Sequence, residues 1–101
     1  MSVVERIMNR NKKVYPIIFD ENANKKEIVI ELTNAGFEVF AHIAAGEIWF
    51  YVRIDQYKLD ELYRYIKKID GVDFNPSPLD IWDAKRVYNC KIDTNILDFM
   101  N

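Results

Sequence analysis

The chain of 101 residues offers few side chains for acid–base or nucleophilic chemistry. It has one histidine, His42, and one cysteine, Cys90. His42 falls inside an expected strand, with no Cys or Ser partner close to it in the sequence, and a metal site would need further ligands of this kind. A histidine in this setting more often packs beside an aromatic ring, and Cys90 suits a small core position. We therefore favour a protein that is not an enzyme, and we expect no cofactor.

Asp20 is the carboxylate with the strongest case for a reactive role. It ends an expected strand, Val14 to Phe19, and precedes an expected helix. Binding sites often gather at such strand ends in sheets covered by helices. The alternative is structural, because Asp20 with Asn22 and Asn24 also suits the turn that starts the helix. We favour the turn.

The strongest binding signal is one face of an expected β-hairpin. Residues 37–54 read FEVFAHIAAGEIWFYVRI, and their side chains alternate between two faces. One face is aliphatic and is predicted core. A register that pairs Ile43 with Ile48 keeps both faces consistent, with a turn of two or four residues at Gly46. The opposite face, here called the aromatic face, is formed by Glu38, Phe40, His42, Trp49, Tyr51 and Arg53.

Two interpretations of the aromatic face are open. An exposed surface of Trp, Tyr and Phe usually marks an interface. Large aromatic side chains are also buried on average, so the C-terminal segment of the same chain is an alternative cover. With aromatics at its centre and Glu38 and Arg53 at its rim, the face matches interface anatomy. We expect a protein partner and a homodimer.

Single-stranded nucleic acid is the second candidate partner. Bases stack on aromatic rings such as Phe40, Trp49 and Tyr51, and Arg53 suits a phosphate. Glu38 and Glu47, however, lie on the same face and would repel phosphate. The formal net charge of −2 adds no general attraction.

The other elements complete an α+β fold. Asn24 and Glu27 form a capping pattern for a helix that ends near Ala35, although the run at 28–30 is also compatible with a strand. Asp55 caps a second helix over residues 56–69, and a short strand is expected at 72–75. The resulting β-α-β-β-α-β order predicts a ferredoxin-like antiparallel sheet with two helices on one face.

The whole chain is expected to form one domain. Residues 1–12 are predicted to form an N-terminal helix, residues 13–75 the core, and residues 76–101 an extension. In that extension, Ser77-Pro78 predicts the start of a short helix, residues 86–92 (RVYNCKI) predict a further strand, and a last turn is expected after residue 93. With no long apolar run, we expect a cytoplasmic protein that does not bind membranes.

The layout loosely resembles the small CRISPR adaptation nucleases. These are short ferredoxin-like chains with an Asp that closes the first strand, as in Ile17–Asp20 (IIFD), and the strand RVYNCKI is also similar. The resemblance implies that Asp20 carboxylates from two subunits hold a divalent metal for phosphodiester hydrolysis. Three hypotheses result: a non-enzymatic regulatory protein that binds or blocks a macromolecule, a single-stranded nucleic-acid-binding domain, and a nuclease centred on Asp20.

Overall fold

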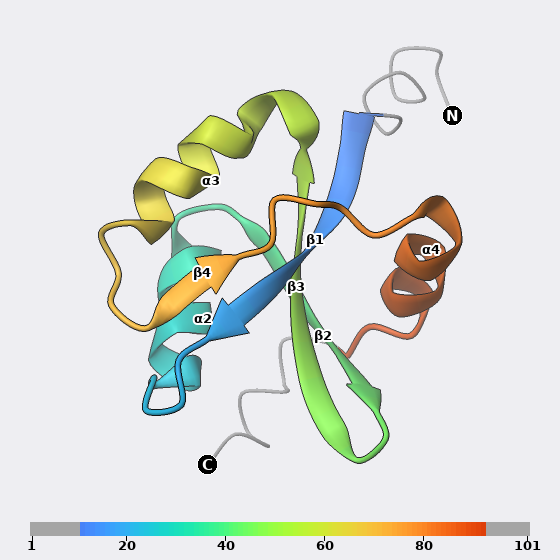
Figure 1. Ribbon diagram of the computed structural model, residues 1–101, viewed down its shortest axis with the longest axis horizontal. Helices are drawn as coiled ribbons and strands as arrows, with labels where there is room; N and C mark the ends of the chain where they lie inside the picture. Colours follow the sequence, from blue (N-terminus) through green and yellow to red (C-terminus); the bar gives the residue numbers. More distant parts are fainter. Residues whose placement is uncertain (1–10, 93–101) are drawn as a thin grey trace.

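A computed structural model of the chain describes residues 11–92. Within them, four strands form one antiparallel sheet in the order β2-β3-β1-β4, and three α-helices accompany it (Figure 1). The α+β class is therefore confirmed. The bounds are β1 Lys12–Phe19, α2 Lys25–Asn34, β2 Glu38–Ala44, β3 Glu47–Asp55, the 3₁₀ turn η1 Gln56–Lys58, α3 Leu59–Ile66, β4 Val72–Phe74 and α4 Ile81–Asn89. The N-terminal helix over residues 1–12 and the last turn after residue 93 were predicted largely outside the described residues.

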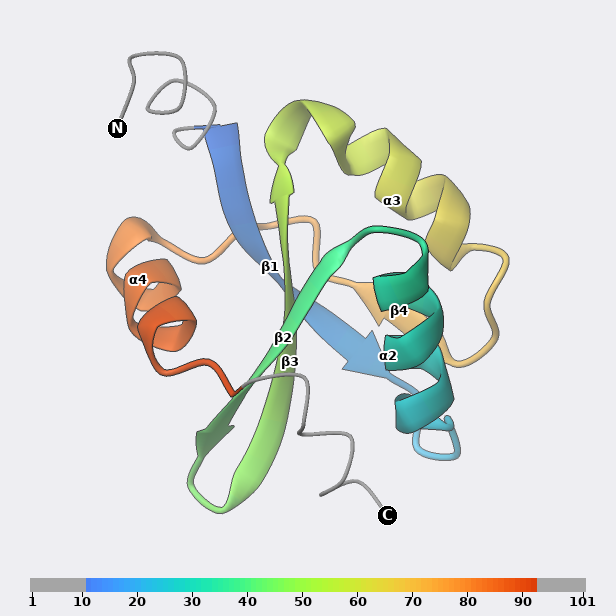
Figure 2. The same ribbon diagram turned by 180° about the vertical axis from the view of Figure 1, so that it is seen from behind.

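The sheet separates two layers. Helices α2 and α3 lie over one face, and α4 lies against the other, as the front and back views show together (Figures 1 and 2). The main core fills the space under α2 and α3, where Leu32 and Leu62 are fully buried. A smaller cluster around Val14, Phe40 and Val87 fills the space under α4. No helix within residues 11–92 has the length and apolarity that a membrane crossing requires.

The predicted helix start at Asn24 is confirmed, whereas Asp55 caps the 3₁₀ turn η1, and α3 itself begins at Leu59 without a side-chain cap. The Asn24 side chain accepts a hydrogen bond from the Glu27 backbone N–H at 3.2 Å, and the Asp55 side chain accepts one from Tyr57 N–H at 2.9 Å. Helix α3 ends at Ile66, three residues before the predicted end. There the backbone tightens into 3₁₀-type bonds, such as Ile69 N–H to the Ile66 carbonyl at 3.0 Å.

The hairpin has the predicted register. Ile43 lies opposite Ile48, and every pair from Glu38 with Arg53 to Ala44 with Glu47 follows. The connection is the shorter of the two alternatives, a two-residue turn in which Ala45 and Gly46 both have positive φ, 54° and 76°. This is the backbone of a type I′ turn, which matches the twist of the two strands.

The prediction for residues 76–92 is wrong in two places. No helix starts at Ser77-Pro78, because the chain there runs beside β1, where Leu79 N–H donates to the Val14 carbonyl at 2.9 Å. The helix begins at Ile81, capped by the Asp80 side chain, which accepts from Asp83 N–H at 2.8 Å.

The further strand predicted at residues 86–92 is also absent from the structure. Helix α4 continues to Asn89, because Ala84, Val87 and Tyr88 share one helical side and pack on the sheet together. Only Ile92 returns to the sheet, as a single bridge to Ala41.

Strand β1 carries the local irregularity that a proline predicts. β1 is an inner strand, between β3 and β4, and Pro16 lies where its pairing changes. Its ladder with β3 ends at the pair Pro16 and Tyr51, and its ladder with β4 begins at the next residue, with Ile17 opposite Phe74. Beyond Pro16, β1 turns toward β4 and away from β3 (Figure 1).

Candidate protein-binding surface

Helix α4 covers one half of the aromatic face. Phe40 is buried there, stacked on Tyr51 with ring centroids 5.6 Å apart and edge-on to Tyr88 of α4 at 5.3 Å. The alternative of a cover from the C-terminal segment therefore holds for this half. Phe40 is a core residue of the second cluster and is not accessible to a partner.

The charges of the aromatic face are paired within the chain. The Arg53 guanidinium lies 3.4 Å from a Glu38 carboxylate oxygen, and Tyr88 donates its hydroxyl to the other Glu38 oxygen at 2.7 Å. Arg53 also donates to the Tyr88 hydroxyl at 3.3 Å and lies 4.7 Å from the centre of its ring. This three-residue network fastens α4 to the hairpin and leaves Arg53 little capacity to bind phosphate.

Tyr51 lies beside the same helix. The pKa of its hydroxyl is raised above the ordinary value, chiefly by burial. Arg86 of α4 acts in the opposite direction, and Asp83 of α4 adds to the rise. Tyr51 therefore stays neutral at physiological pH and serves the packing between the sheet and α4.

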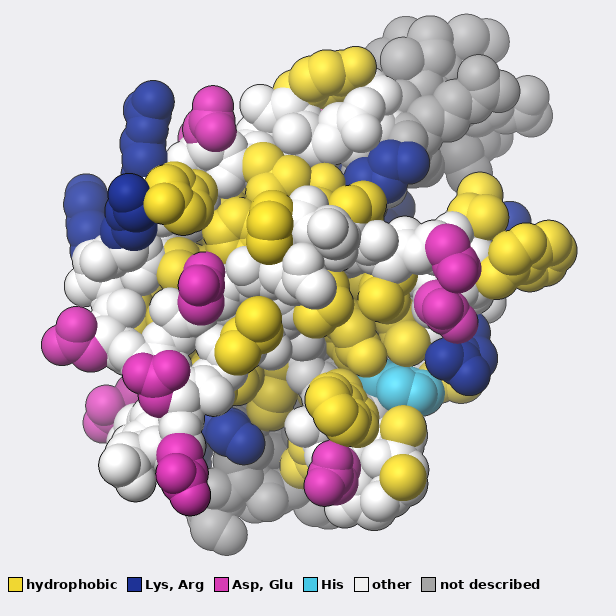
Figure 3. All heavy atoms as spheres, in the orientation of Figure 1, with side chains coloured by type: hydrophobic (Ala, Val, Ile, Leu, Met, Phe, Trp, Pro, Cys, Tyr) yellow, Lys and Arg dark blue, Asp and Glu magenta, His cyan; other side chains and the backbone are white. Residues whose placement is uncertain are grey.

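The other half of the aromatic face is uncovered. Trp49 is 50% exposed, and Ile18 of β1, which alternates onto the same face as Val14, is 51% exposed. Figure 3 shows hydrophobic side chains gathered across this side of the molecule, with the histidine side chain at their margin. We call the surface formed by Pro16, Ile18 and Trp49 the docking end.

His42 lies opposite Trp49 in the hairpin. Its Nδ1 is buried and has no hydrogen-bond partner in the structure. No group of three His, Cys, Asp or Glu side chains within residues 11–92 is placed to hold a metal ion. His42 is thus the cross-strand neighbour of Trp49, as the predicted register requires.

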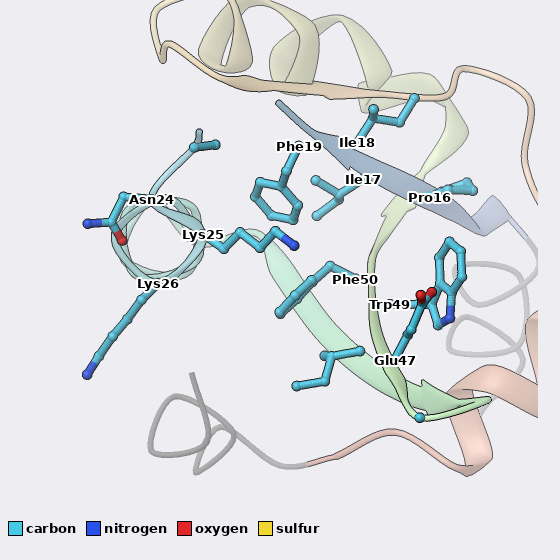
Figure 4. Close-up of a pocket in the computed structure, with 13 residues that line it drawn as sticks. Pro16, Ile17, Ile18, Phe19, Asn24, Lys25, Lys26, Glu47, Trp49 and Phe50 are labelled. Carbon is cyan, nitrogen blue, oxygen red and sulfur yellow. The ribbon is translucent and has the colours of Figure 1, made fainter. Parts of the chain in front are cut away.

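A groove of about 1060 Å³ opens beside the docking end, between the parts of β1 and β3 that no longer pair. β1 continues for three residues beyond Pro16, and β3 holds four residues before Tyr51, so two walls of the groove are strands. Residues 23–26, at the start of α2, line it as well. Ile17, Phe19, Ile48 and Phe50 line it on the side of the main core, and Phe19 and Phe50 meet edge-on with centroids 5.3 Å apart (Figure 4). This groove was not predicted from the sequence, although Pro16 was the signal for it.

The two ends of the groove differ in charge. Lys25, the first residue of α2, extends toward Phe19 and Phe50, whereas Lys26 points away (Figure 4). The Lys25 Nζ lies 5.8 Å from the centre of the Phe19 ring, a cation–π contact. Glu47 stands at the other end, next to the hairpin turn. The groove therefore has a basic end and an acidic end.

Asp20 forms part of the turn between β1 and α2 through its backbone. It is exposed, its N–H donates to the Gly71 carbonyl at 2.8 Å, and its carbonyl accepts from Ala23 N–H at 3.0 Å. These bonds close the turn that leads into the Asn24 cap. Within residues 11–92, Asp20 belongs to no group of three or more His, Cys, Asp or Glu side chains that could hold a metal ion.

Cys90 follows α4 directly and is exposed, so it is not the core residue that the sequence predicted. The helix ends there, with Cys90 as its C-cap residue.

No protein-family model, curated protein or solved structure matches this chain.

Proposed function

We propose that this protein is a small non-enzymatic interaction protein that binds another protein through the docking end and the groove beside it. The observation that carries the proposal is the pair Ile18 and Trp49, two large apolar side chains that are each about half exposed on neighbouring strands, on either side of an open groove. Exposed aromatic and aliphatic side chains at the mouth of a groove are typical anchors of protein interfaces.

A protein partner fits this surface better than single-stranded nucleic acid. A stacking platform needs several open rings and free cations. Phe40 is buried, Tyr51 lies under α4, and Arg53 is paired with Glu38, so Trp49 is the one large ring of the aromatic face that is well exposed for stacking. Glu47 beside it would repel phosphate.

The frame is best regarded as a ferredoxin-like variant. The order β2-β3-β1-β4 places β1 and β3 at the centre, and α2 and α3 follow the first and third strands, as that arrangement requires. The departures are the three-residue β4 and the added helix α4 on the second face. We propose that this frame serves as a cytoplasmic scaffold that presents the docking end.

We also propose the homodimer that was expected from the sequence, but with a different surface as its dimer contact. Ile81 and Trp82, at the start of α4, are 65% and 79% exposed and form a second apolar patch. A two-fold contact through this patch would leave the docking end free for a target. Light scattering behind a sizing column tests it: the mass of Trp82→Glu should fall to that of a monomer, while Trp49→Glu keeps the wild-type mass.

The binding proposal is tested by selecting linear peptides from a displayed random library on the immobilised full chain. The selected peptides should lose binding to Trp49→Glu and to Ile18→Glu. They should still bind Tyr57→Glu, a control variant with its substitution at an exposed aromatic residue of η1. Peptides that bind all three variants alike would place the binding surface elsewhere and reject the proposal.

A further inference from the structure

We infer that the partner is recognised as an extended peptide segment, which enters the groove between β1 and β3, pairs with their free main-chain edges and places a carboxylate beside Lys25. The inference rests on the proposed function and names the chemistry of the partner. It is carried by three features of the groove: the direction of its backbone groups, the side chains on its walls and the charge at its ends.

The free edge of β1 follows from its bonds to the other side. The Pro16 carbonyl accepts from Asn75 N–H at 2.9 Å, and Asp20 N–H donates to the Gly71 carbonyl at 2.8 Å. In an antiparallel strand, alternate residues direct their backbone groups to opposite neighbours. Even-numbered residues of β1 therefore bond toward β4, and the N–H and C=O groups of Ile17 and Phe19 point toward β3.

The free edge of β3 follows in the same way. Tyr15 directs its backbone groups toward β3 and lies opposite Val52, so Val52 directs its own toward β1. Two residues earlier along β3, Phe50 points the same way, and so does Ile48. Since the ladder ends at Pro16 and Tyr51, these edges face the groove without a β1–β3 ladder between them. Unpaired strand edges are bonded best by the backbone of another extended chain.

The walls indicate the side chains of that peptide. On the sheet face of the main core, the groove is lined by the rings of Phe19 and Phe50, and on the opposite face it is bordered by Ile18 and Trp49. Because side chains alternate along an extended chain, an inserted peptide would present residues to both sides, and both sides are apolar. A polar surface loop would gain little from either wall.

The charges at the two ends of the groove indicate in which direction the peptide lies. No described carboxylate forms an ion pair with Lys25, whose Nζ reaches the groove over the Phe19 ring. A carboxylate of the peptide would form a charge-assisted bond at this end. Glu47 would repel a carboxylate at the other end. The partner segment is therefore apolar, extended and acidic toward α2.

The experiment uses the peptide most enriched on the wild-type chain in the selection described above. It is synthesised as such and with N-methyl groups on alternate backbone amides, and the dissociation constants are measured by calorimetry. An acidic residue near one end of the peptide is expected. N-methylation in one of the two alternations should weaken binding about tenfold or more, because it removes main-chain donors. Lys25→Glu should weaken it about tenfold, and Lys68→Glu, an exposed control after α3, should not.

Several results would overturn the inference. If neither N-methylated peptide binds more weakly, or if Lys25→Glu binds as tightly as Lys68→Glu, the groove does not pair with an extended acidic chain. If binding then still requires Trp49, the proposed function stands and only the inference fails. If no peptide is enriched, both the inference and the proposed peptide binding fail. A wild-type dimer that Lys25→Glu splits into monomers would then show that the groove takes a second copy of the chain instead.

Discussion

Pro16 lies opposite Tyr51 at the last pair of the ladder between β1 and β3, and the two strands separate beyond it. Proline has no backbone N–H, and its ring disfavours regular pairing within a sheet. Here the missing donor falls on the β4 side, where only Asn75 N–H bonds to the Pro16 carbonyl. One residue thus marks both the end of the first ladder and the start of the groove.

Amide hydrogen exchange should show this separation directly in the free protein. The N–H groups of Tyr15 and Val52 lie in the ladder and should exchange slowly, whereas those of Ile17 and Phe50 face the groove and should exchange about a hundredfold faster or more, as expected for amides without a partner. NMR exchange rates on the full chain measure it. Equal protection of all four amides would mean that the ladder continues and that no free edge exists.

Tyr88→Phe should loosen α4 from the hairpin. It removes the hydroxyl that donates to Glu38 and accepts from Arg53, at a cost of about 1–2 kcal/mol in the free energy of unfolding. Tyr57→Phe, at an exposed position, should change it by less than about 0.5 kcal/mol. Urea unfolding of both variants provides the comparison. A loss of the same size in both would show that the network does not hold α4.

Ala45→Gly should stabilise the protein. Ala45 has φ 54°, a left-handed conformation that costs alanine energy through its Cβ and costs glycine none. A gain of about 0.5–1 kcal/mol is expected in thermal or urea unfolding. Ala44→Gly is the matched control, because Ala44 is in the strand, where glycine should destabilise by a similar amount. A loss in both variants would contradict the type I′ turn.

Stability should fall at alkaline pH, in part through Tyr15. Burial, with the Asp55 carboxylate as a second cause, raises the pKa of the Tyr15 hydroxyl. The folded chain then keeps this proton at a pH where the unfolded chain releases it. The contribution is complete below about pH 10 and is lost as the pH rises through the folded pKa. Urea midpoints at pH 8 and pH 11 should differ less in Tyr15→Phe than in the wild type; an equal difference would reject this role.

The sequence predicted well where a local pattern and the tertiary environment agree. Strict alternation over the hairpin paired Ile43 with Ile48 correctly, because only one register gathers the aliphatic side chains on one face. The prediction that this whole face is core was wrong at Ile43, near the turn, which is 53% exposed. The Asn24 cap was predicted for the same reason, since its hydrogen bond is made three residues away.

The remainder depends on contacts between distant segments. The seven residues 86–92 are too few for alternation to be told from helical spacing, and the contact of Val87 with Phe40, which selects the helix, joins residues far apart in sequence. The groove was not predicted because it depends on the strand order. The sequence does not show which strands lie on either side of Pro16. The sequence therefore indicated the aromatic face but not which half of it α4 covers.

The measurement that tests the central claim most directly is the affinity of one selected peptide for the wild-type chain and for Trp49→Glu. Circular dichroism should first show that the variant is folded, as expected for a side chain that is half exposed. If the docking end is the binding surface, the dissociation constant for Trp49→Glu should be at least about 30-fold higher than for the wild type. A change of this size is typical of an interface hot spot. An unchanged dissociation constant in a folded variant would contradict the account.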